Sequence, residues 1–172
     1  DLRSFFLNTK KPINIFADPI TAKYLGYSFS YCFQSYSKEY PATLKLNKII
    51  NKCNLLKSNN KIKILPLTVK HGKVNSTCFI INRKLAYISD VSDIDKRDFK
   101  FFKNLKYFVV DCLWYNHHPS HFNLEKSLYF IKKFNPEKAI LTNLSPVLDY
   151  KELNKQLPKN IIPAHDGLVL KL

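Results

Sequence analysis

The stretch of residues 61–121 alternates between apolar runs and polar positions in a way that predicts β-strands. Residues 61–70 alternate well enough for one long strand, and residues 77–81 and 85–89 predict two strands joined by a hairpin-sized turn. Residues 107–110 are continuously apolar, which is typical of a strand buried on both faces. These strands lead into three chemically competent side chains: His71, Asp90 and Asp111. In open α/β folds ligands bind beyond strand ends, so this stretch predicts a metal-dependent active site.

The flanking segments add helices and shorter strands. The clearest helix covers residues 124–134, with one apolar face and Asn123 as its N-cap. Helices are also predicted at 1–7, 18–27 and 149–157, a helix or irregular link at 95–102, an exposed turn at 58–60, and strands at 13–16, 42–46, 139–142, 161–162 and 168–170. Together these elements predict a two-layered α/β domain.

Residues 27–40 form an aromatic segment that has two interpretations. The aromatic side chains are those of Tyr27, Phe29, Tyr31, Phe33, Tyr36 and Tyr40. The segment is either a flap or satellite cluster that packs on the sheet, or a lid that faces a substrate. The sequence pattern does not decide between the two.

The length and composition predict a globular protein. The chain has 172 residues, 45% of them hydrophobic, which is enough to bury a core. No apolar run approaches the roughly 18 residues of a membrane span, and no secretory signal is recognisable. The four cysteines show no Cys-x-x-Cys pair, and Cys78 and Cys112 lie in apolar strand patterns as buried thiols. A reducing, cytoplasmic location is therefore expected, without a membrane.

The formal net charge of +15 raises the question of a nucleic-acid partner. Arginine, which phosphate-binding surfaces favour, occurs at only three positions: Arg3, Arg83 and Arg97. The lysines are spread along the chain among many asparagines and isoleucines, as in the product of an AT-rich genome. Nucleic-acid binding is thus an alternative that the sequence does not favour.

Methionine is absent from the whole sequence. A complete translation product begins with methionine, so we expect a processed chain or a fragment. The first residues already follow a helical pattern without an entry loop. We therefore expect residues 1–172 to be a single domain that lacks its N-terminal strands.

Four groups of side chains are candidates for chemistry. His71 precedes Gly72 at the end of a strand, where an imidazole is held rigidly as a metal ligand or is an ordinary turn residue. Asp90 can bridge two metal ions or cap a turn, and Asp111 can be a supporting carboxylate or a structural hydrogen-bonding group. Residues 117–121 hold three histidines, which suit acid–base chemistry near neutral pH or form a solvated turn.

Taken together, these residues resemble a known family. The matching segments are His-Gly-Lys at 71–73, Ala-Tyr-Ile-Ser-Asp-Val at 86–91, Val-Asp-Cys-Leu at 110–113, His-Pro-Ser-His-Phe-Asn-Leu-Glu at 118–125, Ala-Ile-Leu-Thr-Asn at 139–143, Leu-Asp-Tyr at 148–150 and Pro-Ala-His-Asp-Gly at 163–167. They resemble the metallo-β-lactamase-fold hydrolases, in particular the branch that contains the phosphoribosyl cyclic phosphate phosphodiesterase of phosphonate breakdown. The resemblance covers nearly the whole chain.

The resemblance implies an αβ/βα sandwich with a two-metal site, zinc or manganese, that activates water to attack a phosphodiester. It implies that His71 ligates one metal, that Asp90 bridges both, and that His121 protonates the leaving oxygen. Asp166 would be a supporting or structural carboxylate. A small phosphorylated substrate, such as a cyclic or sugar phosphate, would be the partner, with a homodimer as an open alternative.

Two departures from the family pattern bear on activity. The signature His-x-His-x-Asp-His, expected just upstream of residues 1–6, is not part of this sequence. Relatives carry a ligand histidine at the position of Asn143 or of Ser145, and an amide or hydroxyl oxygen replaces imidazole poorly. We expect the isolated chain to bind metal weakly. A degenerate, non-catalytic module that binds a partner or nucleic acid is the alternative, and an RNA-processing nuclease of the same fold is ranked last.

Overall fold

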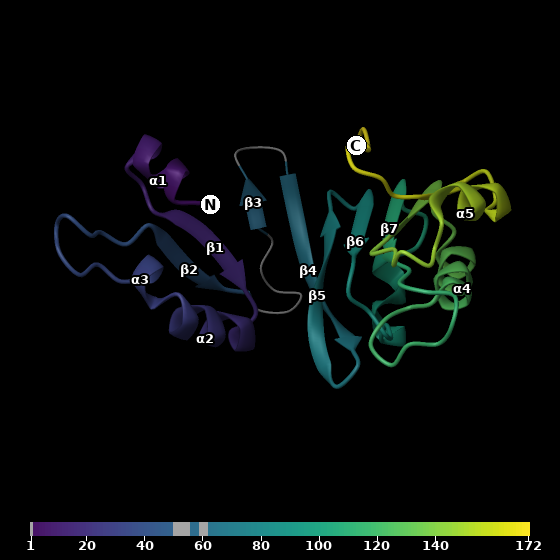
Figure 1. The fold of residues 1–172 in the computed structure, drawn as a ribbon, viewed down its shortest axis with the longest axis horizontal. Coiled ribbons are helices and arrows are strands. Elements are labelled where there is room, and N and C mark those ends of the chain that lie inside the picture. Colours follow the sequence, from purple (N-terminus) through teal and green to yellow (C-terminus); the bar gives the residue numbers. More distant parts are fainter. Residues whose placement is uncertain (1, 50–55, 59–61) are drawn as a thin grey trace. The chain divides into compact units, whose positions relative to one another are not determined.

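The computed structural model describes residues 2–49, 56–58 and 62–172, which form parts of two compact units. The units comprise residues 1–54 and 55–172, and each is described by itself (Figure 1). The single domain predicted over residues 1–172 stays a prediction. Cys53 and positions 59 and 60 of the predicted turn lie outside the described residues.

The N-terminal unit is built around a pair of parallel strands. Its elements are α1 (Arg3–Thr9), β1 (Ile13–Ala17), α2 (Pro19–Ser28), α3 (Ser30–Phe33) and β2 (Leu44–Lys48). β1 and β2 pair in register from Ile13 with Leu44 to Ala17 with Lys48. The Asp18 side chain caps α2 by accepting hydrogen bonds from the N–H groups of Ile20 and Thr21. The strand predicted at 13–16 and the helix predicted at 18–27 are confirmed.

The aromatic segment of this unit contains the end of α2, α3 and a turn. Most of its aromatic side chains are exposed, up to 86% for Tyr27. With α1 and β1, the segment lines a cavity of about 1150 Å³ within the unit. Both interpretations of the segment, a packed flap and a substrate-facing lid, stay predictions.

The second unit contains a seven-stranded sheet in the order β3-β4-β5-β6-β7-β8-β9 (Figure 1). The strands are β3 (Leu56–Ser58), β4 (Ile62–His71), β5 (Val74–Ile81), β6 (Leu85–Ile88), β7 (Tyr107–Asp111), β8 (Lys138–Thr142) and β9 (Ile161–Pro163). β3 to β6 pair antiparallel, whereas β6 to β9 pair parallel. The hairpin and the buried strand predicted from the sequence are confirmed.

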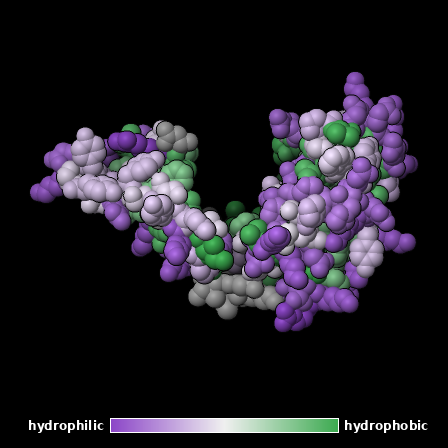
Figure 2. Space-filling view, turned by 60° about the horizontal axis from the view of Figure 1, so that its bottom comes forward, coloured by the Kyte–Doolittle hydropathy of each residue, from purple (hydrophilic) through white to green (hydrophobic). Residues whose placement is uncertain are grey.

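The helices of this unit cover one face of the sheet. They are the 3-10 helix η1 (Lys96–Phe101), α4 (Leu124–Phe134) and α5 (Tyr150–Gln156). Phe108 and Val110 of β7 point into the large core, where Phe134 of α4 is fully buried, while Val109 between them belongs to a smaller cluster. This alternation is what a strand buried on both faces requires. Hydrophilic residues cover much of this unit's visible surface (Figure 2).

The strand predicted at residues 168–170 is wrong. The chain turns at Gly167 and continues without strand pairing. Leu168 and Leu170 instead pack on the small cluster of Leu85 and Val109. Their apolar spacing therefore arises because both side chains cover the second face of the sheet. The segment itself is not a strand of the sheet.

Two further expectations concern burial. The thiols of Cys78 and Cys112 are both fully buried, as predicted. Among the described residues, no helix is long and apolar enough to cross a membrane.

Candidate metal centre

The candidate residues meet at one edge of the seven-stranded sheet. β4 and β6 are both antiparallel to β5, so they run in the same direction, and β7 and β8 are parallel to β6. The carboxyl ends of all four strands therefore lie at this edge. His71 ends β4, Asp90 follows β6, Asp111 ends β7 and Asn143 follows β8. His121 comes from the loop between β7 and α4, so four strand ends and one loop build the site.

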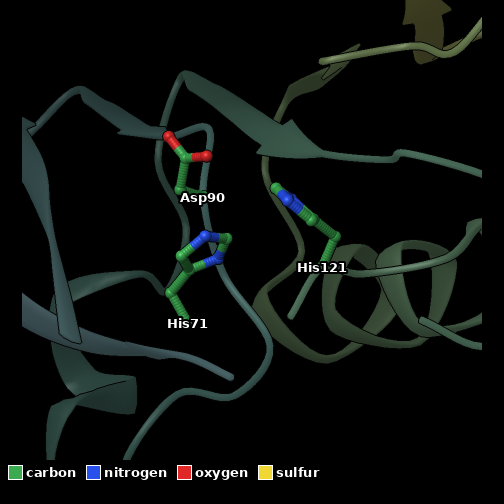
Figure 3. Close-up of side chains that lie close together, drawn as sticks. All are labelled: His71, Asp90 and His121. Atoms are coloured by element: carbon green, nitrogen blue, oxygen red, sulfur yellow. The ribbon is translucent and has the colours of Figure 1, made fainter. Parts of the chain in front are cut away.

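Three side chains converge to a separation suited to metal binding (Figure 3). One ligand atom each from His71, Asp90 and His121 lie within 4.8 Å of one another. The two imidazole rings meet edge to face, with their centroids 4.6 Å apart. Zinc bonds of about 2.0–2.2 Å place two ligands of one ion roughly 3–4 Å apart, close to this separation. The fold thus brings together His71 and Asp90, which follow predicted strands, and His121, which the family resemblance singled out.

A backbone carbonyl determines how His71 faces the site. Its Nδ1 lies 2.7 Å from the carbonyl oxygen of Ser120. A carbonyl oxygen only accepts hydrogen bonds, so Nδ1 carries the proton and the neutral ring has its lone pair on Nε2. A histidine whose other nitrogen is bonded to an oxygen in this way is the usual form of a metal ligand.

A buried carboxylate orients His121. The Nδ1 atom of His121 lies 2.8 Å from Oδ2 of Asp111, whose side chain is completely buried. The same oxygen accepts the N–H of Val91 at 3.1 Å. Burial raises the pKa of the Asp111 carboxyl above its ordinary value, while hydrogen bonds from Val91, His121 and Asn143 offset part of this increase. Asp111 is therefore a hydrogen-bond partner of His121.

Asn143 supports this carboxylate from the other side. The residue has a positive φ of 61° at the end of β8, a conformation that asparagine tolerates. Its Nδ2 amide donates to Oδ1 of Asp111 at 3.1 Å and to the carbonyl of Ser89 at 3.2 Å. These bonds use both amide protons, so the approach of Nδ2 to His121 Nδ1 at 3.2 Å is a contact between two donors. Asn143 lies at the site as a hydrogen-bond donor.

Asp90 is held by neighbouring hydroxyl groups. Ser89 Oγ donates to the Asp90 carboxylate at 2.9 Å, and Ser76 Oγ donates to the Asp90 backbone carbonyl. The second bond ties the loop after β6 to β5. The second oxygen of the carboxylate has no hydrogen bond among those described, which leaves it able to face a cation.

The remaining candidates lie outside the three-residue group. Asp166 is exposed in the turn before Gly167, and its carbonyl oxygen accepts a hydrogen bond from His165 at 2.9 Å. Ser145 has a buried hydroxyl without a hydrogen-bond partner among the described residues. His118 is half-buried, and its Nδ1 accepts the N–H of Ser120 at 3.2 Å. The geometry tests no role for these three residues.

The sequence predicted no role for one residue of the site, Ser120. Ser120 acts through its backbone carbonyl, and any residue type provides a carbonyl. The only sequence signal was indirect, in the glycine that follows His71. A glycine next to a candidate ligand indicates a close approach by another segment, and Ser120 supplies that approach.

The donor set fits part of a divalent-metal centre. Two imidazoles with anchored Nδ1 atoms and one carboxylate are ligands that zinc and manganese accept. A zinc site takes three or four protein ligands, and a two-metal site takes more. His71 and Asp90 would therefore hold a metal ion together with further ligands. Among the described residues, His121 lies beside them as a third candidate ligand.

Comparison with known proteins now places the chain. Residues 1–142 match the model of the Beta-lactamase superfamily domain. The chain belongs to this family. Comparison with curated protein sequences gives no match.

Solved structures of the same fold agree. A diphosphatase from the PhnP family aligns with a TM-score of 0.86 and 26% identity, covering 100% of this chain and 64% of that one. Human tRNase Z, short form, aligns with a TM-score of 0.66 and 14% identity over 99% of this chain and 71% of that one. Zn²⁺-bound PqqB from Methylobacterium extorquens aligns with a TM-score of 0.71 and 13% identity over 96% and 67%. The last two show the fold alone.

The predicted metallo-β-lactamase fold is confirmed. The resemblance to the branch that contains the phosphoribosyl cyclic phosphate phosphodiesterase is confirmed as well. This chain spans less than two thirds of the length of the diphosphatase.

Proposed function

We propose that this chain carries part of the active centre of a metal-dependent hydrolase that cleaves a phosphodiester, such as a cyclic or sugar phosphate. The observation that carries the proposal is the convergence of His71, Asp90 and His121 within 4.8 Å at the carboxyl ends of the strands. The similarity to a diphosphatase of the PhnP family supports a phosphorylated substrate.

The metal ligands in this proposal are His71 and Asp90. Nε2 of His71 and the carboxylate of Asp90 would hold zinc or manganese, with Asp90 between two ions. When bound, such ions supply Lewis acidity at the phosphoryl oxygen and lower the pKa of water for attack. Asp166 has no role in this centre that geometry supports, since its side chain is exposed in a turn.

His121 is the proton donor in this proposal. Asp111 accepts the Nδ1 proton of His121, so the carboxylate stabilises the imidazolium and directs Nε2 away from itself. Protonated at both nitrogens, the ring would donate its Nε2 proton to the leaving oxygen. The same division of roles between a carboxylate and an imidazole operates in hydrolytic triads.

The decisive experiment combines metal quantification with hydrolysis of a bis-aryl phosphate. Asp90→Ala is expected to lower both the metal content and turnover. His121→Ala is expected to abolish turnover with the metal content unchanged, and His117→Ala, an exposed histidine of the same loop, is the matched control. A loss of metal in His121→Ala would make His121 a ligand and not the proton donor.

A second candidate is a non-catalytic module that binds a polyanion. Asn143 and Ser145 stand where relatives supply a ligand imidazole, and Asn143 is already engaged with Asp111. In addition, a hollow of about 370 Å³ is lined by four lysines, Lys70, Lys96, Lys126 and Lys133, and by two aspartates, Asp93 and Asp95. This candidate predicts salt-sensitive binding of a fluorescent RNA oligonucleotide, weakened by Lys70→Gln and Lys96→Gln and unchanged in Lys151→Gln. Phosphodiester turnover without such binding would exclude it.

A further inference from the structure

Gly72 and the loop before α4 approach each other closely at the site. Gly72 has a φ of +60°, and a Cβ atom at this position would lie 2.6 Å from Ser120 Oγ and 3.3 Å from Ser120 Cβ. Real Cβ atoms do not approach other heavy atoms to 2.6 Å. A Cβ at position 72 would therefore collide with the Ser120 side chain, and the positive φ adds strain for any residue other than glycine.

This approach brings the Ser120 carbonyl to His71. The hydrogen bond from Nδ1 of His71 to Ser120 O is 2.7 Å long and joins segments 49 residues apart. Gly72 is fixed from its other side, because its N–H donates to Ser92 Oγ at 2.9 Å. A side chain at position 72 would thus displace the Ser120 loop and draw its carbonyl away from His71.

The same loop carries the proposed proton donor. Ser120 precedes His121 directly, and its N–H donates to Nδ1 of His118 at 3.2 Å. The carbonyl of Ser120 thus faces the imidazole of His71, and the next residue in the chain is His121. A displacement of Ser120 moves His121 with it.

We propose that Ser120, seated against Gly72, is the positioning residue of His71. Its carbonyl holds the imidazole proton on Nδ1, presents Nε2 as the metal-binding atom, and couples the ligand to the loop that bears His121. The inference rests on the proposed function in taking His71 as a metal ligand. It adds an explanation of how the chain selects which nitrogen of His71 binds the metal.

The first test is the protonation pattern of His71 in the metal-free 172-residue chain. Two-dimensional ¹⁵N–¹H NMR of the histidine rings, recorded at alkaline pH, should report the Nδ1–H tautomer for His71. Gly72→Ala should shift it toward the Nε2–H form that predominates in free histidine. A wild-type His71 in the Nε2–H form overturns the proposal, even if Gly72→Ala fails to fold.

The second test separates the close approach from backbone strain. Gly167 also has a positive φ, +84°, but a Cβ there would meet nothing within 4 Å. Gly167→Ala therefore measures the cost of an alanine at positive φ without the collision, and it should leave the His71 tautomer unchanged. The double variant Gly72→Ala/Ser120→Gly, which removes the colliding side chain, should recover the Nδ1–H tautomer relative to Gly72→Ala. Failure to recover overturns the proposal.

The third test uses metal affinity, measured by titration of the chain with Co²⁺ and its visible absorption. Loss of a group that orients a ligand typically weakens metal binding roughly 10- to 100-fold, and this is expected for Gly72→Ala. Gly167→Ala, which places an alanine at positive φ without the collision, should bind like wild type. If His71→Gln leaves Co²⁺ affinity unchanged, the proposed ligand set fails. If His71→Gln lowers the affinity and Gly72→Ala does not, only the positioning role fails.

Discussion

The Nδ1 atom of His121 lies 2.8 Å from the carboxylate of Asp111, a side chain with no exposed surface. This pair joins the loop before α4 to the end of β7, and Val91 and Asn143 complete the hydrogen bonds of the carboxylate. The imidazole therefore has one fixed nitrogen and one that is available for chemistry. The first prediction concerns this pair.

Asp111→Asn should impair catalysis more than folding. Asparagine fills the same space, but its amide does not stabilise an imidazolium, so His121 loses its support as proton donor. General acid catalysis contributes roughly 10²- to 10⁴-fold, and we expect kcat for a bis-aryl phosphate to fall by a factor in this range. Steady-state kinetics provide the measurement. Wild-type kcat in Asp111→Asn would show that the pair is structural.

The free energy of unfolding should depend on pH through Asp111. Burial raises the pKa of this carboxyl in the folded state above its unfolded value, near 3.8, so the folded state binds the proton more tightly. The resulting stabilisation is fully present below the unfolded pKa and is lost as pH rises through the folded pKa. Urea unfolding at a series of pH values should show this loss in the wild type and its disappearance in Asp111→Asn. Identical pH profiles for the two proteins would contradict the raised pKa.

Phe134→Ala should destabilise the second unit strongly. The ring is fully buried and stacks on Phe102 at a centroid distance of 5.2 Å, with Phe130 and Phe108 at 5.4 and 5.7 Å. Truncation of a buried phenylalanine costs about 3–5 kcal/mol in the free energy of unfolding. Chemical denaturation measures this loss. Phe5→Ala, at a position that is 62% exposed, is the comparison and should change stability by less than about 1 kcal/mol.

The cysteines should differ in reactivity with a thiol reagent. Burial raises the pKa of the Cys112 thiol to about 12 and raises that of Cys78 as well. Both should stay unmodified in the native chain, since the thiolate is the reactive form. Cys32 is half-buried and should react first in a Cys53→Ser background. Mass spectrometry after brief labelling identifies the modified positions, and early modification of Cys78 would disprove the packing of its core.

The sequence predicted the elements of the second unit because its strands and helices follow plain periodicities. The strand at 107–110 and the helix at 124–134 needed only apolar spacing and a cap at Asn123. Residues 168–170 were misassigned because an apolar spacing of two suits both a strand and a segment laid over a sheet. Local pattern does not distinguish these two ways of burying the same side chains.

The residues of the candidate site also differ in how far the sequence predicted them. His71 and Asp90 could be found because each follows a recognisable strand, and strand ends share an edge when the strands are parallel. The role of Asp111 stayed open from sequence, because a carboxylate at the end of a buried strand can support a metal site or form structural hydrogen bonds. The Ser120 carbonyl had no sequence signal of its own. Its position depends on how two loops pack, which is a property of the tertiary structure.

The hydrogen bond between His71 and Ser120 spans 49 residues of chain and four strands of the sheet order. It forms only after β4 and the loop beyond β7 have both taken their places. Contacts between segments so distant in sequence close late, because the loop entropy must be overcome first. The appearance of the His71 ring proton on Nδ1 should therefore mark the assembly of β4 to β7 in the sheet, and not the formation of any single hairpin.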